Sequence, residues 1–304
     1  MVDQVRTLRF EVVDVFTRRA FAGNPLAVVH GAEGLDTGQL AAIAREFNLS
    51  ETVFPLPPTT SAASYRARIF TPAGELPFAG HPSVGVAWVL ARDGVIGLGD
   101  GVQECGAGLL AVRVDASGAR VAGGPPSVGP PRDAGALAAA VGLTAGDVAT
   151  GLPAGVASAG LEFAVLPVHA DAVARAVVPA TGDVPPPGRL LVVSFSPAPG
   201  ADGEAVPGSA GAAHARMFAP GISVPEDPAT GSAAVALAVF LVDRGALPAD
   251  GESAFVVRQG AEIGRPSTLE VEVTARRGAA VRTSVGGPVV GVSSGTIAVP
   301  PPTS

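Results

Sequence analysis

The sequence predicts an α+β protein built from two similar halves, each with strands packed around one very buried helix. The first observation is a motif, R-x-F-x-P, that occurs at residues 68–72 and again 148 residues later at 216–220. The second is that a turn-rich segment and then an apolar run follow each copy. Both runs, 81–94 and 232–245, extend thirteen residues from their first position to a closing glycine. The third is that strand-like segments lie between the helical ones.

Both apolar runs have the local chemistry of buried helices. Pro82 suits the first position of the earlier helix, and Thr230 or Ser232 suits the N-cap region of the later one. Gly94 and Gly245 suit the left-handed position that follows a helix. Because each run is apolar on nearly all sides, we expect both helices to be buried.

The remaining elements repeat in a similar way. Residues 36–49 have the capping-box spacing Asp36 to Gln39 and a helical apolar stripe, and residues 133–143 are a shorter version. The Pro/Gly-rich stretch 122–133 is the best candidate for an inter-domain linker. Strands are expected at residues 10–16, 26–30, 109–115, 161–168, 189–195, 269–274 and 289–294.

Composition excludes several classes of protein. The net charge of -7 argues against a nucleic-acid partner, which needs clustered basic charge. All 20 basic residues are arginine, so no side-chain amine is available for a Schiff base, as in pyridoxal-phosphate enzymes, or for a Walker A motif. No apolar run is long enough to cross a membrane. The single cysteine, Cys105, and an N-terminus without a signal-peptide core favour the cytoplasm.

Four polar residues stand at the openings of predicted elements. His81 precedes the first buried helix between Gly80 and Pro82, where it either caps the helix or meets a ligand. Asp227 either complements the second helix dipole or belongs to a site, and its neighbour Glu226 is expected to be solvated. Glu51 is either a solvent-facing residue at a strand start or, between apolar neighbours, a carboxyl of raised pKa suited to moving a proton.

Other motif matches fail on their context. Residues 291–295 match G-x-S-x-G, but no helix follows, as a nucleophile elbow requires. Residues 106–111 resemble part of a dinucleotide fingerprint but lead into a strand. The four histidines and Cys105 show no metal-ligand spacing, so we expect no metal site.

Several blocks together resemble the phenazine biosynthesis PhzF-like isomerase family, which has the diaminopimelate epimerase fold. The most specific are FAGHPSVG at 78–85 and EDPATGSAA at 226–234; others are DVFTRRAFAGNPLAVV, FNLSETVF, QGAEIGRPS and VGGPVVGVSSG. The resemblance runs from about residue 12 to 297. It implies two pseudo-symmetric halves, residues 1–122 closed by a C-terminal strand in 288–304, and residues 123–287.

The same resemblance assigns site residues. Glu51 matches the family's proton-transferring carboxylate, and His81 and Asp227 match its other catalytic polar groups. In the substrate-binding set, Gly80 and Gly231 match positions where backbone amides meet the substrate, and Ser232 matches a further pocket group. The resemblance also implies a small carboxylate as substrate, a homodimer and no cofactor.

The predicted function is a cofactor-independent isomerase of a small carboxylic acid. The family reaction is isomerisation of trans-2,3-dihydro-3-hydroxyanthranilate. Epimerase relatives use two cysteines, and none stands at either helix opening here, which excludes a thiol pair. Two alternatives remain open: an epimerase or racemase that uses Glu51 with His81 as two bases, and a binding protein of the same fold that does not turn its ligand over.

Overall fold

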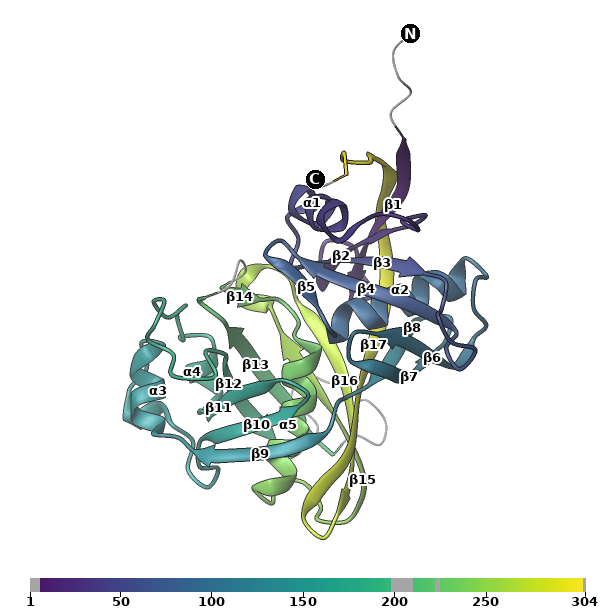
Figure 1. Ribbon diagram of the computed structural model, residues 1–304. Coiled ribbons are helices and arrows are strands. Elements are labelled where there is room, and N and C mark those ends of the chain that lie inside the picture. The colour runs from purple at the N-terminus through teal and green to yellow at the C-terminus, as the bar shows by residue number, and fades with distance from the viewer. Residues whose placement is uncertain (1–5, 198–209, 222–224, 303–304) are drawn as a thin grey trace. The chain divides into compact units, whose positions relative to one another are not determined.

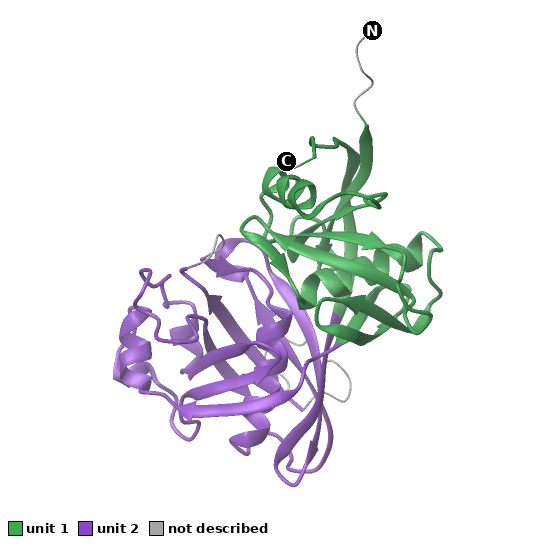
Figure 2. Cartoon of the chain, viewed as in Figure 1, with its two compact units in different colours: residues 1–121, 287–304 green, residues 122–286 purple. Residues whose placement is uncertain are grey.

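The computed structural model describes residues 6–197, 210–221 and 225–302 (Figure 1). The chain forms two compact units, Met1–Val121 with Gly287–Ser304 and Ala122–Gly286 (Figure 2). In each unit a curved sheet surrounds one long helix, so the predicted α+β class with two pseudo-symmetric halves is confirmed. In the described ranges, no helix combines the length and apolar character that crossing a membrane requires.

Unit 1 begins with β1 and closes with a strand from the end of the chain. Strands that lie side by side in this sheet are antiparallel, except for two parallel pairs, β2–β3 and β4–β6. The long strand β17 (Ala279–Ala298), from the end of the chain, pairs with both β1 and β8. The other elements are β1 (Thr7–Val15), β2 (Asn24–Val29), α1 (Thr37–Phe47), β3 (Glu51–Leu56), β4 (Tyr65–Thr71), β5 (Gly74–Leu76), α2 (Gly80–Arg92), β6 (Gly99–Cys105), β7 (Gly108–Val114) and β8 (Gly118–Ala122).

Unit 2 repeats this order of pairing. Its two parallel pairs are β11–β12 and β13–β15, in the places of β2–β3 and β4–β6. Its elements are β9 (Pro126–Pro131), α3 (Ala134–Ala140), η1 (Ala145–Asp147), β10 (Gly155–Ala159), β11 (Glu162–Pro167), α4 (Ala170–Val173), β12 (Leu190–Ser196), β13 (Ala212–Phe218), β14 (Glu226–Asp227), α5 (Gly231–Asp243), β15 (Gly251–Gln259), η2 (Ala261–Ile263), β16 (Ser267–Arg276) and the first part of β17.

The stretch 122–133 is not simply the linker that its composition predicts. Residues 126–131 form β9, which pairs antiparallel with β10 through Pro131 opposite Gly155 and Val128 opposite Ala157. Proline is tolerated in strands at positions that donate no ladder hydrogen bond. The proline content therefore concealed a strand of unit 2.

The two central helices are the cores of their units. Residues 231–242 of α5 are all buried, against β9, β10, β11 and β16. In α2, residues 80–87 are buried, and the helix contacts β1 to β4 and β7. Gly85 allows this approach, because a Cβ there would lie 2.5 Å from Leu26 and 3.0 Å from Val15. Burial on all sides follows from helices that are apolar all round.

The helix ends agree with their sequence signals except at the start of α2. Asp36 forms the predicted capping box with Gln39 at the start of α1, and Gly94 and Gly245 take φ of +73° and +70° after α2 and α5. However, α2 starts at Gly80, so Pro82 is its third residue and not its first. A proline fits there too, because the first-turn amides have no partner within the helix.

The repeated motif R-x-F-x-P builds the same clamp in each unit. The Arg68 guanidinium stacks over Phe70 at 5.2 Å and makes two 2.7 Å hydrogen bonds to Glu75, which pairs with Phe70 across β4 and β5. In unit 2, Arg216 stacks over Phe218 at 5.0 Å and bonds Glu226, which pairs with Phe218 across β13 and β14, at 2.8 and 2.7 Å. Each clamp fixes the hairpin that leads into a central helix.

Candidate active site

Unit 1 brings Glu51 and His81 into contact. Glu51 is the first residue of β3 and pairs with Leu26 of β2, while His81 is the second residue of α2. The distance from Glu51 Oε2 to His81 Nδ1 is 3.3 Å, and their side chains are 17% and 4% exposed. Glu51 is therefore a half-buried carboxylate beside an imidazole, and not the fully solvated strand residue of its alternative interpretation.

The environment keeps His81 neutral. Burial lowers the pKa of His81 to about 3, and a hydrogen bond to the backbone carbonyl of Pro25 opposes this effect only in part. Asn24 Nδ2 lies 3.4 Å from His81 Nδ1, and Ser50 Oγ lies 3.1 Å from Asn24 Oδ1. A neutral imidazole carries no charge, so His81 lies beside the Glu51 carboxyl without forming an ion pair with it.

Unit 2 places Asp227 four residues before the start of α5. Asp227 lies on β14 opposite Met217, and its Oδ2 accepts a 2.6 Å hydrogen bond from the Thr230 hydroxyl. Gln259, at the end of β15, donates to the Asp227 carbonyl at 2.7 Å and to Thr230 Oγ1 at 3.1 Å. Gly231 and Ser232 are the first two residues of α5, and both are buried.

The two central helices begin without a side-chain cap in the described part of the chain. Ala79 and Thr230 occupy the N-cap positions of α2 and α5, and neither side chain accepts from a first-turn amide. By contrast, Asp36 and Asp133 cap α1 and α3 through their carboxylates. First-turn amides and the positive end of the helix dipole suit an anionic ligand such as a carboxylate.

The expectation for Glu226 is wrong. Glu226 is buried with Arg216 in a pair whose side chains are 6% and 8% exposed. The Arg216 guanidinium also donates to the backbone carbonyls of Ala174, at 3.4 Å, and Ala176. A buried carboxylate is tolerated because a bidentate guanidinium meets both of its oxygens.

Sequence reasoning missed three residues that contact the predicted site residues. Asn24, Thr230 and Gln259 all hydrogen-bond to predicted site residues. Thr230 was interpreted only as a helix cap, and Asn24 and Gln259 only as parts of family-like blocks. The available signal for Gln259 was its position two residues after the apolar strand-like run AFVV, at 254–257.

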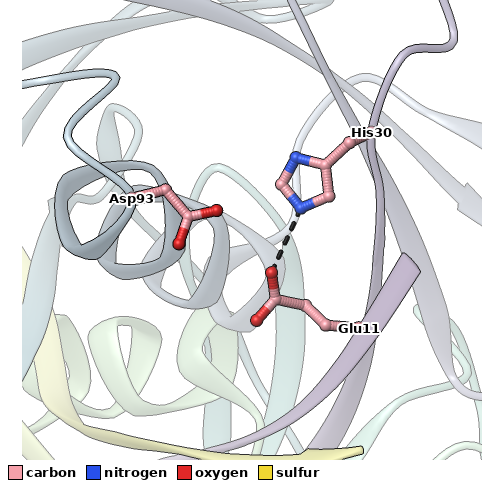
Figure 3. Close-up of side chains that lie close together, drawn as sticks. All are labelled: Glu11, His30 and Asp93. Carbon is pink, nitrogen blue, oxygen red and sulfur yellow. Dashed lines mark hydrogen bonds and ion pairs between the residues drawn. The ribbon is translucent and has the colours of Figure 1, made fainter. Parts of the chain in front are cut away.

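A separate cluster of unit 1 has the composition of a metal site. Among the described residues, Glu11, His30 and Asp93 come within 4.8 Å of one another through one possible ligand atom each (Figure 3). Glu11 lies on β1, His30 follows β2 and Asp93 follows α2, so the three residues are far apart in the sequence and no spacing motif predicted them. His30 Nε2 lies 3.2 Å from Glu11 Oε1.

Two arginines make this cluster an ion-pair network. Arg92 lies 2.7 Å from both Glu11 Oε2 and Asp93 Oδ1, and Arg9 lies 2.9 Å from Asp93 Oδ2. Burial alone would raise the pKa of Glu11, but hydrogen bonds from His30 and Arg92 hold it below its usual value. Two guanidinium groups already bind the carboxylates that a metal would need, and they repel a cation.

The comparisons with known proteins agree with this architecture. The model of the family described as phenazine biosynthesis-like protein matches residues 13–295. An uncharacterized isomerase of Mesorhizobium japonicum is 38% identical, over 96% of this chain and 99% of its own length. The trans-2,3-dihydro-3-hydroxyanthranilate isomerase of Pseudomonas chlororaphis is 30% identical, over 95% and 98%.

A solved structure supports the fold independently. The PhzF-family phenazine biosynthesis protein of Bacillus anthracis superimposes with a TM-score of 0.82 at 23% identity, over 96% of this chain and 99% of that one. The family match covers nearly the whole chain, and the two relatives described above are named isomerases. The chain therefore belongs to the phenazine biosynthesis-like (PhzF) protein family and is an isomerase of that family.

Proposed function

We propose that this isomerase acts on a small carboxylic acid and needs no cofactor, with Glu51 as the group that transfers the proton. The observation that carries the proposal is the 3.3 Å contact between Glu51 and a buried, neutral His81. The relative from Pseudomonas chlororaphis is named for a dihydro-hydroxyanthranilate substrate, an acid of this class. We propose that substrate class, and not that one compound, for this chain.

The proposed reaction is a proton shift without net oxidation. The Glu51 carboxylate removes a proton from a carbon, and the electron pair of that bond moves into the adjacent unsaturated system. The resulting Glu51 carboxylic acid then returns the proton to a different carbon. Atoms and electrons balance within the substrate, and general acid–base catalysis of this kind contributes about 100- to 10,000-fold to the rate.

The other predicted residues have supporting roles in the proposal. His81 orients the Glu51 carboxyl through Nδ1 and, because it is neutral, does not trap the proton as an imidazolium ion. Asp227 binds the amine or hydroxyl group of the substrate. The substrate-binding residues that we propose are Gly80, at the uncapped start of α2, and Gly231 and Ser232, at the uncapped start of α5. Each helix start offers first-turn amides that suit an anionic group.

The test is transfer of hydrogen isotopes catalysed by the wild-type protein. A panel of unsaturated and cyclic carboxylic acids would be incubated in deuterium oxide and followed by proton NMR. We expect at least one acid to isomerise, and E51Q to lose about 100-fold or more of that activity. E46Q is the matched control, because Glu46 is an exposed glutamate of the same unit.

A second labelling experiment separates the proposal from its alternatives. When the transferred position of the substrate carries deuterium and the solvent is water, one base retains part of the label in the product. Complete loss of label with inversion of a stereocentre would favour the two-base epimerase. If no acid is converted but one binds, the non-catalytic binding protein is the better description. Full activity in E51Q would refute the assigned role.

A further inference from the structure

Thr230 occupies the N-cap position of α5 but does not cap the helix. Its hydroxyl donates to Asp227 Oδ2 at 2.6 Å, and its side chain accepts no hydrogen bond from the first turn of α5. In the same chain, Asp36 and Asp133 perform the capping role at α1 and α3. A threonine at this position usually stabilises its helix by accepting from an amide, so its hydroxyl here has a different partner and a different use.

Gln259 fixes the direction of this hydrogen bond. Gln259 is 2% exposed, and its Oε1 accepts from the Thr230 backbone amide at 3.3 Å. Its Nε2 donates to the Asp227 carbonyl at 2.7 Å. A backbone amide can only donate and a carbonyl can only accept, so these two partners determine which end of the side-chain amide is oxygen.

The hydroxyl of Thr230 is therefore committed to one orientation. Gln259 Nε2 also donates to Thr230 Oγ1 at 3.1 Å, which occupies the oxygen as an acceptor. The one hydroxyl proton then points to Asp227 Oδ2. The chain of donors runs from Gln259 through Thr230 to Asp227, and Asp227 receives a hydrogen bond that an ionised carboxylate binds more strongly than a protonated one.

The turn after β15 supports the same arrangement. Gly260 has φ of +81°, and a Cβ there would lie 2.5 Å from the carbonyl oxygen of Pro228. Only glycine combines this left-handed conformation with so close an approach. The backbone that follows Gln259 is thus packed against Pro228, the residue that follows Asp227.

From this geometry we infer that Thr230 and Gln259 are positioning residues that hold Asp227 in one rotamer as an ionised hydrogen-bond acceptor. The importance of this relay for catalysis rests on the function proposed above, in which Asp227 binds the substrate. The relay itself is a property of unit 2 and does not require turnover. Different experiments can therefore refute the relay and the proposed function.

The structure provides matched controls. Thr283 is 2% exposed, and among the described residues its hydroxyl has no hydrogen-bond partner, so T283V matches T230V without a relay. Gln103 is fully buried and donates to Ser83 near the start of α2, while Tyr65 donates to it. Because no carboxylate belongs to that network, Q103L matches Q259L.

The first experiment measures Asp227 directly. Protein labelled with carbon-13 at the aspartate carboxyls would be titrated by NMR, and D227N would assign the signal of Asp227. We expect the titration midpoint of this signal to rise in T230V and Q259L, because each variant interrupts the donor chain. T230S should restore the wild-type midpoint, and T283V and Q103L should not move it. An unchanged midpoint in T230V would overturn the inference, whether or not a substrate is known.

The second experiment asks whether the relay matters for turnover. With an acid that the wild type converts, T230V should lose about 10- to 100-fold in kcat/KM, as expected when a hydrogen bond to a charged group is lost. The acidic limb of its pH–rate profile should move to higher pH, and T230S should recover most of the activity. If T230V keeps the wild-type rate and profile, the relay has no catalytic role. If the wild type converts no acid, the proposed function fails, and the titration still decides the inference.

Discussion

Glutamine in place of Glu226 tests the stabilising role of the clamp in unit 2, and E75Q supplies its matched control. Both glutamates make bidentate hydrogen bonds to the motif arginine, at 2.7 to 2.8 Å. The two pairs differ in burial. The side chains of Arg216 and Glu226 are 8% and 6% exposed, whereas those of Arg68 and Glu75 are 17% and 37% exposed.

The expected losses follow from that difference. Removing one partner of a buried ion pair costs about 3–5 kcal/mol, because the other charge stays buried without compensation. Arg216 would keep the carbonyls of Ala174 and Ala176 and the face of Phe218. We therefore expect E226Q to lower the free energy of unfolding by about 3 kcal/mol, the lower end of that range. An exposed pair is worth about 0.2–1 kcal/mol, so E75Q should cost less than about 1 kcal/mol.

The assay must separate the two units, because a chain of this size need not unfold in one step. Trp88 is the only tryptophan of the sequence and lies on α2, so its fluorescence follows unit 1. Hydrogen exchange of β13 amides, measured by mass spectrometry, follows unit 2. In urea, E226Q should accelerate exchange in β13, while the fluorescence transition changes little.

Equal losses in E226Q and E75Q would refute the reasoning, since burial would then not decide the strength of the clamp. A double variant gives a second check. Replacing both partners with apolar residues, as in R216M with E226L, should recover much of the stability lost in E226Q, because no charge remains buried. If the double variant is less stable than E226Q, the clamp contributes more than charge compensation.

Three further predictions concern unit 1. Burial lowers the pKa of His81 to about 3, so between pH 6.5 and about 3 the unfolded chain binds a proton that the folded chain does not. The free energy of unfolding therefore falls with the pH in this range, by about 2 kcal/mol between pH 7 and 5. Thermal unfolding of H81N should depend less on pH. G85A should destabilise α2 by about 1–2 kcal/mol in urea, because overpacking against Leu26 exceeds the gain in helix propensity. E11Q should lower the free energy of unfolding by about 2 kcal/mol above pH 4.5 and by less as the pH falls further. Added zinc should leave the wild-type melting temperature unchanged.

Helices α1, α2, α3 and α5 and several of the longer strands were predictable because each carries its own signal. Three examples are the capping box of Asp36 and Gln39, the glycines after the central helices and the alternating pattern of β16. Each depends only on residues that are close together in the sequence. The short strands β5 and β14 span three and two residues, too few to show a period, and β9 was hidden by its prolines. These three strands form by pairing with β4, β13 and β10, and such pairing leaves no signal in their own residues.

The site was predictable only in part, because contacts between distant residues depend on the fold. Glu51 and His81 are thirty positions apart and meet because β3 and α2 begin side by side in unit 1. The clamps were hidden by a change in spacing, since Glu75 follows its arginine by seven residues and Glu226 by ten. No local pattern distinguishes a glutamate held by a distant arginine from a solvated one, which is why the expectation for Glu226 failed.

The repeat also bears on whether one base or two carry the proposed reaction. In the register of the two units, Thr52 and Leu190 occupy the same place, opposite the motif residues Phe70 and Phe218. Glu51 therefore corresponds to Arg189, which precedes Leu190, and an arginine stays protonated at any working pH.

The other polar groups are just as asymmetric. Four residues before the start of each central helix, Asp227 corresponds to Leu76, and one residue after the start, His81 corresponds to Ser232. A two-base epimerase with equivalent halves would need an acid or base at matching positions, as a thiol pair provides. Here the backbone is repeated but the proton-active groups are not, and this asymmetry argues against a pair of bases with one base in each half.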